Sequence, residues 1–116
     1  MELKKLTIDG KQVEFVNAFR GTRNGFAHDT TLFIDGYVMA QHTCHYLNRT
    51  WERYTYQTVM RCAVCDLEEE RENRLKDKFK TEKGYAKLTP KRKLELAEVI
   101  DADEDMRFYR AILAQL

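Results

Sequence analysis

The chain has 116 residues, of which 43% are hydrophobic and 34% are charged, and its formal net charge is +1. This length and composition predict one compact domain, 1–116, which buries its core without disulfides. The near-zero net charge excludes a strong overall attraction to nucleic acids or membranes. An odd cysteine count, no signal-peptide pattern and no membrane-length apolar run predict a reducing, cytoplasmic setting without membrane contact.

Three turn-forming dipeptides divide the first 47 residues into strand-like segments. Asp9-Gly10, Asn24-Gly25 and Asp35-Gly36 each tolerate the positive φ angles that a two-residue type I′ turn requires. We therefore predict a four-stranded antiparallel meander. Its strands are residues 3–8, 11–22, 26–34 and 37–47.

Two-residue turns also predict how the strands align, because the residues that flank each turn pair with one another. Phe15 is then expected opposite Ile34, Leu32 opposite Met39, and Arg20 opposite Asp29. One face collects the large apolar side chains, namely Leu6, Ile8, Val13, Phe15, Phe19, Phe26, Leu32, Ile34, Tyr37 and Met39. The opposite face holds polar residues, with His42 and Cys44 among them, and a smaller apolar set of Val16, Ala18, Phe33, Val38, Ala40 and Tyr46.

A long helix is predicted over residues 48–83. Its first half carries one apolar stripe at helical spacing, which is the expected cover for the apolar sheet face. The stripe consists of Tyr56, Met60, Ala63 and Leu67. Asn48 or Thr50 is the expected N-cap. Beyond Leu67 the sequence is mainly charged, with acidic and basic residues four apart, so we expect that half to be solvated and without a core.

Two shorter C-terminal helices are predicted next. Thr89 and Pro90 suit the N-cap and first residue of one helix. Asp101 is the expected cap of the other, because Glu104 follows it in a capping-box pattern. The apolar sides are Leu94, Ala97 and Ile100 in the first helix and Met106, Tyr109, Ile112, Leu113 and Leu116 in the second.

The predicted fold class is therefore α+β. A β-meander, residues 1–47, is covered on one face by the long helix, 48–83, and is followed by a helical pair, 89–116. The pair is amphipathic and must pack on the sheet, on the long helix or on a second chain. The sequence leaves the oligomeric state open.

His42, Cys44, His45, Cys62 and Cys65 are the residues that could ligate a metal. Cys62 and Cys65 lie three apart on one helix face, as metal ligands can. The predicted register points His42 and Cys44 away from the helix, which leaves His45 as the better third ligand. Because isolated cysteines more often act as small hydrophobes, we predict no metal and no cofactor.

Two groups of arginines suggest nucleic-acid binding as an alternative function. Arg20 and Arg23 lie near the tip of the second hairpin, and Arg49, Arg53 and Arg61 lie near the helix start. Guanidinium groups pair with phosphates or guanine edges, and a two-stranded ribbon can enter a major groove. Hairpin tips are ordinarily polar, however, and the net charge lacks the basic excess of most nucleic-acid-binding proteins.

The expected partner is a protein, and no catalytic motif is recognised. The sequence has no glycine-rich phosphate loop and no nucleophile elbow, so we predict that the protein is not an enzyme. Lys91, Arg92 and Lys93 lie at a helix N-terminus, where cations are unfavourable unless an acidic group pairs with them. The candidate contacts are Val16, Phe33, Val38 and Tyr46 on the open sheet face, together with Lys91, Arg92 and Lys93.

The segment YLNRTWERYTYQ, residues 46–57, resembles a group of small phage and prophage proteins with the signature Tyr-x-Asn-Arg-Thr-Trp-Glu-x-Tyr. The resemblance covers about residues 26–64 and brings no established activity. It implies a non-catalytic accessory protein of a mobile element. Such proteins bind other macromolecules, often as inhibitors of host defence nucleases such as CRISPR effectors, or as DNA-binding regulators.

A zinc-stabilised small domain is the third hypothesis, after protein binding and nucleic-acid binding.

Overall fold

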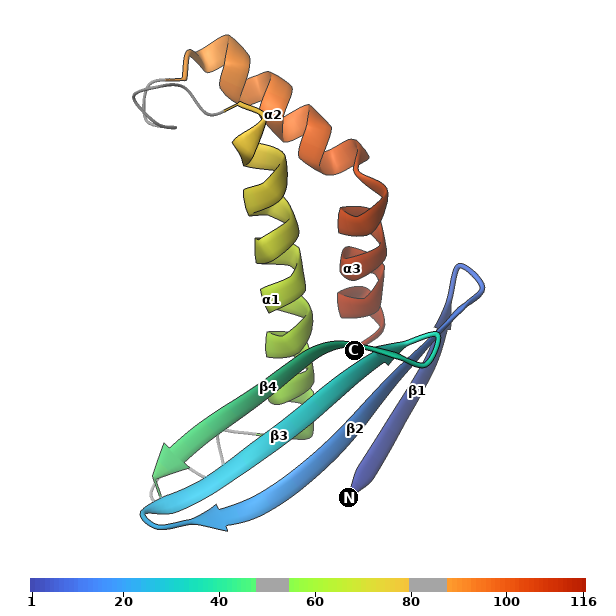
Figure 1. The fold of residues 1–116 in the computed structure, drawn as a ribbon, viewed down its shortest axis with the longest axis vertical. Coiled ribbons are helices and arrows are strands. Elements are labelled where there is room, and N and C mark those ends of the chain that lie inside the picture. The colour runs from blue at the N-terminus through green and yellow to red at the C-terminus, as the bar shows by residue number, and fades with distance from the viewer. Residues whose placement is uncertain (48–54, 80–87) are drawn as a thin grey trace.

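The computed structural model describes residues 1–47, 55–79 and 88–116, which form the predicted α+β fold. The sheet is antiparallel with strand order β1-β2-β3-β4, and two of the three helices rise from one of its faces (Figure 1). The strands are β1 (Glu2–Ile8), β2 (Lys11–Thr22), β3 (Gly25–Ile34) and β4 (Tyr37–Leu47). The helices are α1 (Tyr56–Asp77), α2 (Pro90–Ala102) and α3 (Glu104–Gln115).

The first and third turns have the backbone conformation predicted from their Asp-Gly dipeptides. Asp9 and Gly10 have φ angles of 51° and 78°, and Asp35 and Gly36 have φ angles of 49° and 84°. Two successive positive φ values are the mark of a type I′ turn, whose twist matches that of the strands it joins. Both predictions are confirmed.

The second turn differs from the prediction. Thr22 pairs with Gly25, so the loop is residues 23–24 and not Asn24-Gly25. Phe15 consequently pairs with Leu32 and not with the predicted Ile34. The shift moves each pairing by two residues, and side chains alternate with a period of two, so every side chain of β2 and β3 stays on its predicted face.

Contacts at the other end of this hairpin stabilise the observed alignment. The Asp35 backbone N–H donates to the Gln12 carbonyl at 2.8 Å, and the Gln12 N–H donates to the Asp35 carboxylate at 2.8 Å. These bonds lie next to the Val13–Ile34 pair. The alignment of β2 with β3 is therefore fixed by the β3–β4 turn as well as by the β2–β3 loop.

A β-bulge in β4 reverses the orientation of most of that strand. Phe33 pairs with Val38, but Leu32 pairs with Ala40, so Met39 is an extra residue without a partner in β3. Such an insertion shifts the alternation of side chains beyond it by one residue. The residues that face α1 are therefore Ala40, His42, Cys44 and Tyr46. The prediction that they lie on the open face was wrong.

Helix α1 begins at Tyr56, after the N-cap Thr55, whose hydroxyl accepts the N–H of Thr58 at 3.3 Å. The predicted start at 48 and the predicted caps, Asn48 and Thr50, lie outside the described residues. The predicted end at 83 was wrong, because the helix ends at Asp77.

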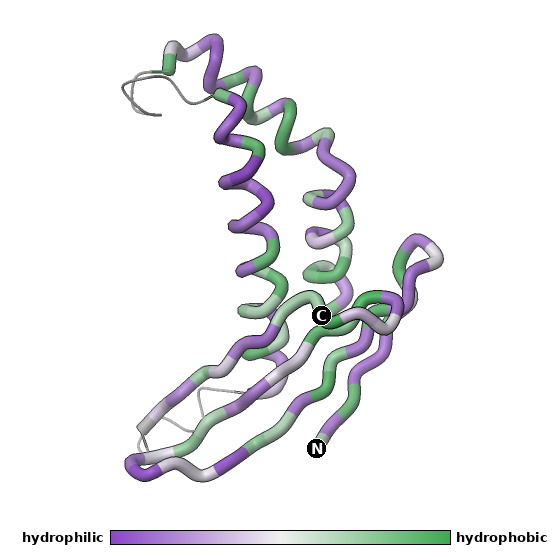
Figure 2. The backbone as a smooth tube through the Cα atoms, in the orientation of Figure 1, coloured by the Kyte–Doolittle hydropathy of each residue, from purple (hydrophilic) through white to green (hydrophobic). Residues whose placement is uncertain are grey.

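The main core lies between the sheet and the first half of α1, and α3 closes one side of it. As predicted, the apolar sheet face packs under the apolar stripe of α1. Figure 2 shows that the hydrophobic part of α1 is its sheet end and that hydrophilic residues follow. Full burial of one large apolar side chain contributes about 1.5–3 kcal/mol. The buried members are Ile8, Val13, Phe15, Leu32, Met60, Val64, Leu67, Phe108, Tyr109 and Ile112.

A buried polar pair lies beneath α1 in the middle of the sheet. Asn17 and Thr30 pair directly across β2 and β3 and are both fully buried. The Thr30 hydroxyl donates to the Asn17 side-chain carbonyl at 2.6 Å, and the Asn17 amide donates to the Met60 sulfur at 3.3 Å. Each group thus finds a partner, which removes most of the penalty of burying it.

A second, smaller core lies beyond the sheet. It consists of Leu75, Leu88, Leu96, Ile100 and Met106, with Phe79 packed against it. The prediction that the second half of α1 is solvated and without a core was therefore wrong. The predicted apolar side of α2 was partly wrong too, because Leu96 and Ile100 are buried whereas Leu94 and Ala97 are exposed.

Asp103 forms the corner between α2 and α3. It is the C-cap of α2 and the N-cap of α3, where its carboxylate accepts the N–H of Met106 at 3.0 Å. The prediction of Asp101 as this cap was wrong by two residues. Arg71 of α1 donates two hydrogen bonds to the same carboxylate, at 2.8 and 3.0 Å. These bonds from Arg71, together with the one from Met106, outweigh the effect of burial and lower the pKa of Asp103.

Candidate functional site

The open face of the sheet carries three of the four apolar residues that were predicted there as partner contacts. Val16 and Phe33 are half-buried on this face, and Val38, which pairs with Phe33, is 58% exposed. Tyr46 was placed wrongly, because the bulge turns it to the helix side, where it is buried. The open face alone is therefore a smaller apolar surface than predicted.

Tyr46 belongs to an aromatic cluster near the start of α1. Its ring lies 5.5 Å from that of His28 and 5.9 Å from that of Phe26, measured between centroids. His28 also meets the ring of Tyr56 edge-on at 5.1 Å and that of Phe19 at 5.1 Å. Burial among these rings lowers the pKa of His28. This cluster is a structural element between sheet and helix.

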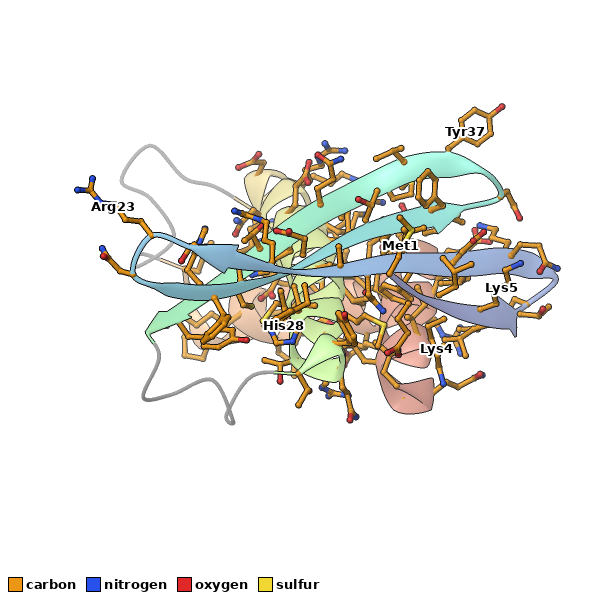
Figure 3. All side chains as sticks on the ribbon, turned by 90° about the horizontal axis from the view of Figure 1, so that it is seen from below. Met1, Lys4, Lys5, Arg23, His28 and Tyr37 are labelled. Carbon is orange, nitrogen blue, oxygen red and sulfur yellow. The ribbon has the colours of Figure 1, made fainter. Side chains whose placement is uncertain are left out.

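The β3–β4 hairpin exposes three consecutive large apolar residues. Tyr37 is 75% exposed, Val38 58% and Met39 41%. Figure 3 shows Tyr37 at the hairpin end, with its ring directed away from the sheet. Tyr37 and Met39 had been predicted to lie in the core. The missed signal is that three successive residues cannot all face one side of a regular strand, so an apolar triplet there indicates a bulge or an exposed patch.

A groove opens beside this hairpin, between β4 and the helices α1 and α3. Its volume is about 270 Å³. Val38 and Met39 form one wall, and Leu67 and Tyr109 contribute apolar surface from the helices. Pockets for drug-sized ligands span roughly 300–1,000 Å³, so this groove suits one or two side chains better than a whole cofactor.

The helical rim of the groove is charged and internally paired. Arg74 contacts Glu70 at 2.6 Å, and Arg71 approaches Asp105 at 3.6 Å in addition to its bonds with Asp103. Acidic and basic groups are thus balanced around the apolar floor. Sequence reasoning missed this rim, because it treated these charges as the solvated surface of an isolated helix.

Arg20 lies on the open sheet face and is engaged there. It faces Ala27 directly, and its Nε donates to the carboxylate of Asp29 at 2.9 Å, so the predicted ion pair forms along a diagonal. Thr43 donates to the same carboxylate at 2.5 Å. Burial acts to raise the pKa of Asp29, but the hydrogen bonds from Arg20 and Thr43 outweigh it and the pKa is lowered.

The other predicted arginines do not form one surface with Arg20. Arg23 extends from the β2–β3 loop into solvent (Figure 3). Arg61 donates to the Leu113 carbonyl at 3.1 Å and so joins α1 to α3. Arg49 and Arg53 lie outside the described residues.

The basic triplet at the start of α2 is exposed. Lys91 and Lys93 lie on either side of Arg92, which pairs with Glu95 and stacks its guanidinium 4.4 Å from the centre of the Phe79 ring. One of the three cations, Arg92, is therefore engaged within the chain, by an acidic residue of its own helix.

The structure brings together a different set of metal-ligating side chains from the one predicted. His45 faces the open side and Cys65 is exposed. A ring nitrogen of His42 and the sulfurs of Cys44 and Cys62 instead lie within 4.8 Å of one another. The sequence-based inference that His42 and Cys44 point away from the helix was wrong, because it assumed a strand without a bulge.

Burial raises the pKa of two thiols in this region, those of Cys44 and Cys65. Burial, and then the neighbouring Cys62 and Asp66, raise the pKa of Cys44 to about 11. Burial and the nearby Glu68 likewise raise the pKa of Cys65. Neither thiol is therefore an activated nucleophile at neutral pH.

Comparisons of the chain with protein-family models, with curated proteins and with solved structures found no match. Among the described residues, every helix is too short or too polar to cross a membrane. The function is therefore argued from the surfaces described above.

Proposed function

We propose that this chain is a non-catalytic protein that binds a protein partner through the β3–β4 hairpin and the adjoining groove. The observation that carries the proposal is the exposure of Tyr37, Val38 and Met39 next to a groove with Leu67 and Tyr109 in its lining. Contiguous exposed apolar surface of this kind commonly marks an interaction site. The partner would insert an apolar side chain into the groove and cover the hairpin.

The charge pattern favours a protein over a nucleic acid. The rim residues Glu70, Arg71, Arg74 and Asp105 balance one another, and an apolar centre with a polar rim is the usual anatomy of a protein interface. A nucleic-acid site needs cations that are available to phosphates. The two arginines of this rim are already paired with carboxylates.

The bulge argues for side-chain insertion rather than strand addition. β4 is an edge strand, and an added strand would need a regular row of backbone groups along it. Met39 interrupts that row within the apolar patch, and bulges are a common means by which edge strands avoid such pairing. The exposed side chains therefore supply the contact.

The biological setting that we propose is that of a phage or mobile-element accessory protein in the cytoplasm, with a host or phage protein as its partner. The specific activity that we propose for the chain is inhibition of a host defence nuclease, as by anti-CRISPR proteins. The support is the resemblance over residues 46–57, much of which lies outside the described residues. The three cysteines, all of them free thiols, suit a reducing compartment.

Direct nucleic-acid binding is the alternative proposal. Arg23 at the β2–β3 tip supports it, because its side chain reaches into solvent. Arg20 and Arg61 are engaged with Asp29 and with the Leu113 carbonyl, which weakens it.

The test compares capture of partners by the wild-type chain and by a hairpin variant, Tyr37→Thr, Val38→Thr and Met39→Gln. These substitutions remove apolar area, and the threonines at 37 and 38 are β-branched residues that favour a strand. We expect the wild type to retain a protein from a lysate of its native host, identified by mass spectrometry, and the hairpin variant to lose it. The purified partner should then bind the variant at least about tenfold more weakly, which is 1.4 kcal/mol.

Leu94→Thr is the matched control, because Leu94 is 62% exposed on α2, away from the hairpin. It should bind like the wild type. Equal binding by the wild type and the hairpin variant would refute the proposed surface. A mobility shift with DNA or RNA at low salt that Arg23→Gln weakens and the hairpin variant does not would establish the alternative instead.

A further inference from the structure

The cluster His42, Cys44 and Cys62 joins an edge strand to the helix that covers it. His42 and Cys44 are two residues apart on β4 and share its α1 face because of the bulge at Met39. Cys62 projects from the buried side of α1 toward them, so that the two sulfurs are 4.0 Å apart. Two of the three donors come from one strand and the third from a helix far along the chain, so their convergence is a product of the fold.

We propose that His42, Cys44 and Cys62 bind a thiophilic divalent cation of the zinc type, which would link β4 to α1. This inference goes beyond the proposed function and does not depend on it, because it rests on side chains that the hairpin surface does not include.

The distances fit such an ion with small adjustments. Zinc lies about 2.3 Å from sulfur and about 2.0–2.1 Å from nitrogen in a tetrahedral site, so two bound sulfurs are about 3.8 Å apart and sulfur and nitrogen about 3.5 Å. The Cys44 and Cys62 sulfurs at 4.0 Å nearly meet this requirement, and a ring nitrogen of His42 lies within 4.8 Å of both sulfurs, which is about 1.3 Å beyond the distance in a zinc site. No other group of three such side chains comes this close within the described residues.

The donor types select the class of cation. Thiolate and imidazole ligands favour zinc and related soft or borderline metals, whereas calcium and magnesium take oxygen ligands. Three protein ligands leave a fourth tetrahedral position for water or for a group on a partner. The half-buried position of Cys44 and Cys62 keeps them accessible to an ion while the strand and helix hold them in place.

Asp66 supplies the outer contact that metal-bound histidines commonly have. Its carboxylate lies 2.7 Å from Nδ1 of His42 and can only accept, so Nδ1 carries the hydrogen. The other ring nitrogen, Nε2, is then the one with a free lone pair. Asp66 is one helical turn beyond Cys62, so a single face of α1 provides both a ligand and the group that orients the imidazole.

The experiment is a metal titration of the pure, reduced, chelator-treated protein with Co²⁺ and then Zn²⁺. We expect one equivalent per chain, with the visible ligand-field bands of tetrahedral cobalt, thiolate-to-cobalt charge transfer in the near ultraviolet, and displacement by zinc. Cys44→Ser, Cys62→Ser and His42→Asn should each abolish stoichiometric retention through gel filtration. Asp66→Asn should weaken binding by about 10–100-fold, the usual effect of removing such an outer contact.

Two neighbouring residues supply matched controls. Cys65→Ser removes a thiol one turn along the same helix, and His45→Asn removes an imidazole from the same strand but from its open face. Both should bind cobalt like the wild type. Circular dichroism of each variant would separate loss of ligands from loss of fold, and serine is close enough to cysteine in size to leave the packing intact.

Four outcomes would overturn the proposal. These are an absence of tetrahedral cobalt bands in the folded wild type, unchanged binding in Cys44→Ser or Cys62→Ser, loss of binding in Cys65→Ser or His45→Asn, and a Cys44–Cys62 disulfide that forms in place of the metal site in the presence of zinc. Each leaves the hairpin surface untouched, so failure of this inference and failure of the proposed function are distinguishable.

Discussion

His28 is a titratable residue in an otherwise aromatic environment. Its ring packs against those of Phe19, Tyr46 and Tyr56, and burial lowers its pKa although the adjacent Asp29 acts to raise it. The folded protein therefore favours the neutral imidazole. Protonation would place a charge among aromatic rings on the helix side of the sheet, where few polar groups could stabilise it.

We expect the stability of the wild type to fall in mild acid because of this residue. A group whose folded pKa is depressed contributes stability above its unfolded pKa, here about 6.5, and that contribution is lost as the pH falls through the folded pKa. His28→Phe keeps an aromatic ring and removes the titration. Urea unfolding at about pH 7.5 and about pH 5.5 should show a larger loss for the wild type than for the variant. Parallel losses would contradict the assignment to His28.

Asn17 and Thr30 are a buried pair that a register inferred from turns alone does not reveal. Neither was among the predicted members of the apolar face, and nothing in the sequence indicated that they would pair with one another. The observed pairing, two residues away from the predicted one, brings them side by side so that each satisfies the other. Buried polar groups need such partners, which gives a physical reason for the observed alignment.

The carboxylate of Asp103 makes contacts with all three helices at the corner between α2 and α3. It ends α2, begins α3 and accepts both hydrogen bonds from Arg71 of α1. Two predictions about helix ends were wrong, the α3 cap at Asp101 and the α1 end at 83. A capping pattern identifies which residue types can cap, whereas the cap that forms is the one that tertiary contacts also support.

We expect Asp103 to contribute stability that is lost in acid. Hydrogen bonds from Arg71 lower its pKa, so its contribution is present above its unfolded pKa of about 3.9 and is lost as the pH falls below that value toward the folded pKa. At neutral pH, Asp103→Ala should destabilise the protein by about 0.5–2 kcal/mol through loss of the cap.

Asp103→Asn is the matched comparison, because asparagine still caps a helix but cannot form the charged pair with Arg71. It should lose less stability than the alanine variant at neutral pH and should show a flatter dependence on pH below about 4. An asparagine variant with the pH profile of the wild type would show that the acid sensitivity arises from other carboxylates.

The whole molecule is elongated, 48 × 36 × 21 Å, and it has two cores at different distances from the sheet. Figure 1 shows α1 and α3 extending from the sheet to α2, which crosses their far ends. The second core is small and rests on Leu75 of α1 and Met106 of α3. We therefore expect α2 to open more readily than the sheet, as peripheral units with few apolar contacts do.

Leu75→Ala tests this division. Leu75 is 3% exposed, and truncation of a buried leucine costs about 2–5 kcal/mol. Hydrogen exchange should accelerate most in α2 and least in β2 and β3. Leu94→Ala on the exposed side of α2 should change stability by less than about 0.5 kcal/mol. Uniform acceleration across both cores would show that the molecule opens as one unit.

The sequence predicted the architecture well because local signals are strong in this chain. Asp-Gly dipeptides defined two hairpins, the apolar spacing from Tyr56 to Leu67 defined the covering helix, and Thr89-Pro90 defined the start of α2. The second core could not be predicted, because single leucines in a charged helix carry no periodic signal. Its members become a group only when α2 folds back on α1.

The candidate sites were harder to predict than the fold because they depend on the bulge. In a strand without the bulge, the polar residues Gln41, Thr43 and His45 would face α1 and the aromatic Tyr46 would face solvent. This unfavourable distribution is a signal in the sequence against regular alternation along β4. Both the exposed hairpin triplet and the His42, Cys44 and Cys62 cluster follow from that one irregularity. A prediction based on a regular strand places Met39 in the core and places His42 and Cys44 on the open face.

The bulge at Met39 also determines which face of the sheet the later side chains of β4, from Ala40 onward, point to. Loss of one amino acid between Tyr37 and Ala40 would make the strand regular and keep Leu32 paired with Ala40, so His42 and Cys44 would still lie on the surface that meets α1. Straightening of the bulge without such a loss would instead exchange them for Thr43 and His45, although none of the four would have been substituted. A single gap at this position in an alignment of related chains is therefore compatible with the same chemistry between β4 and α1.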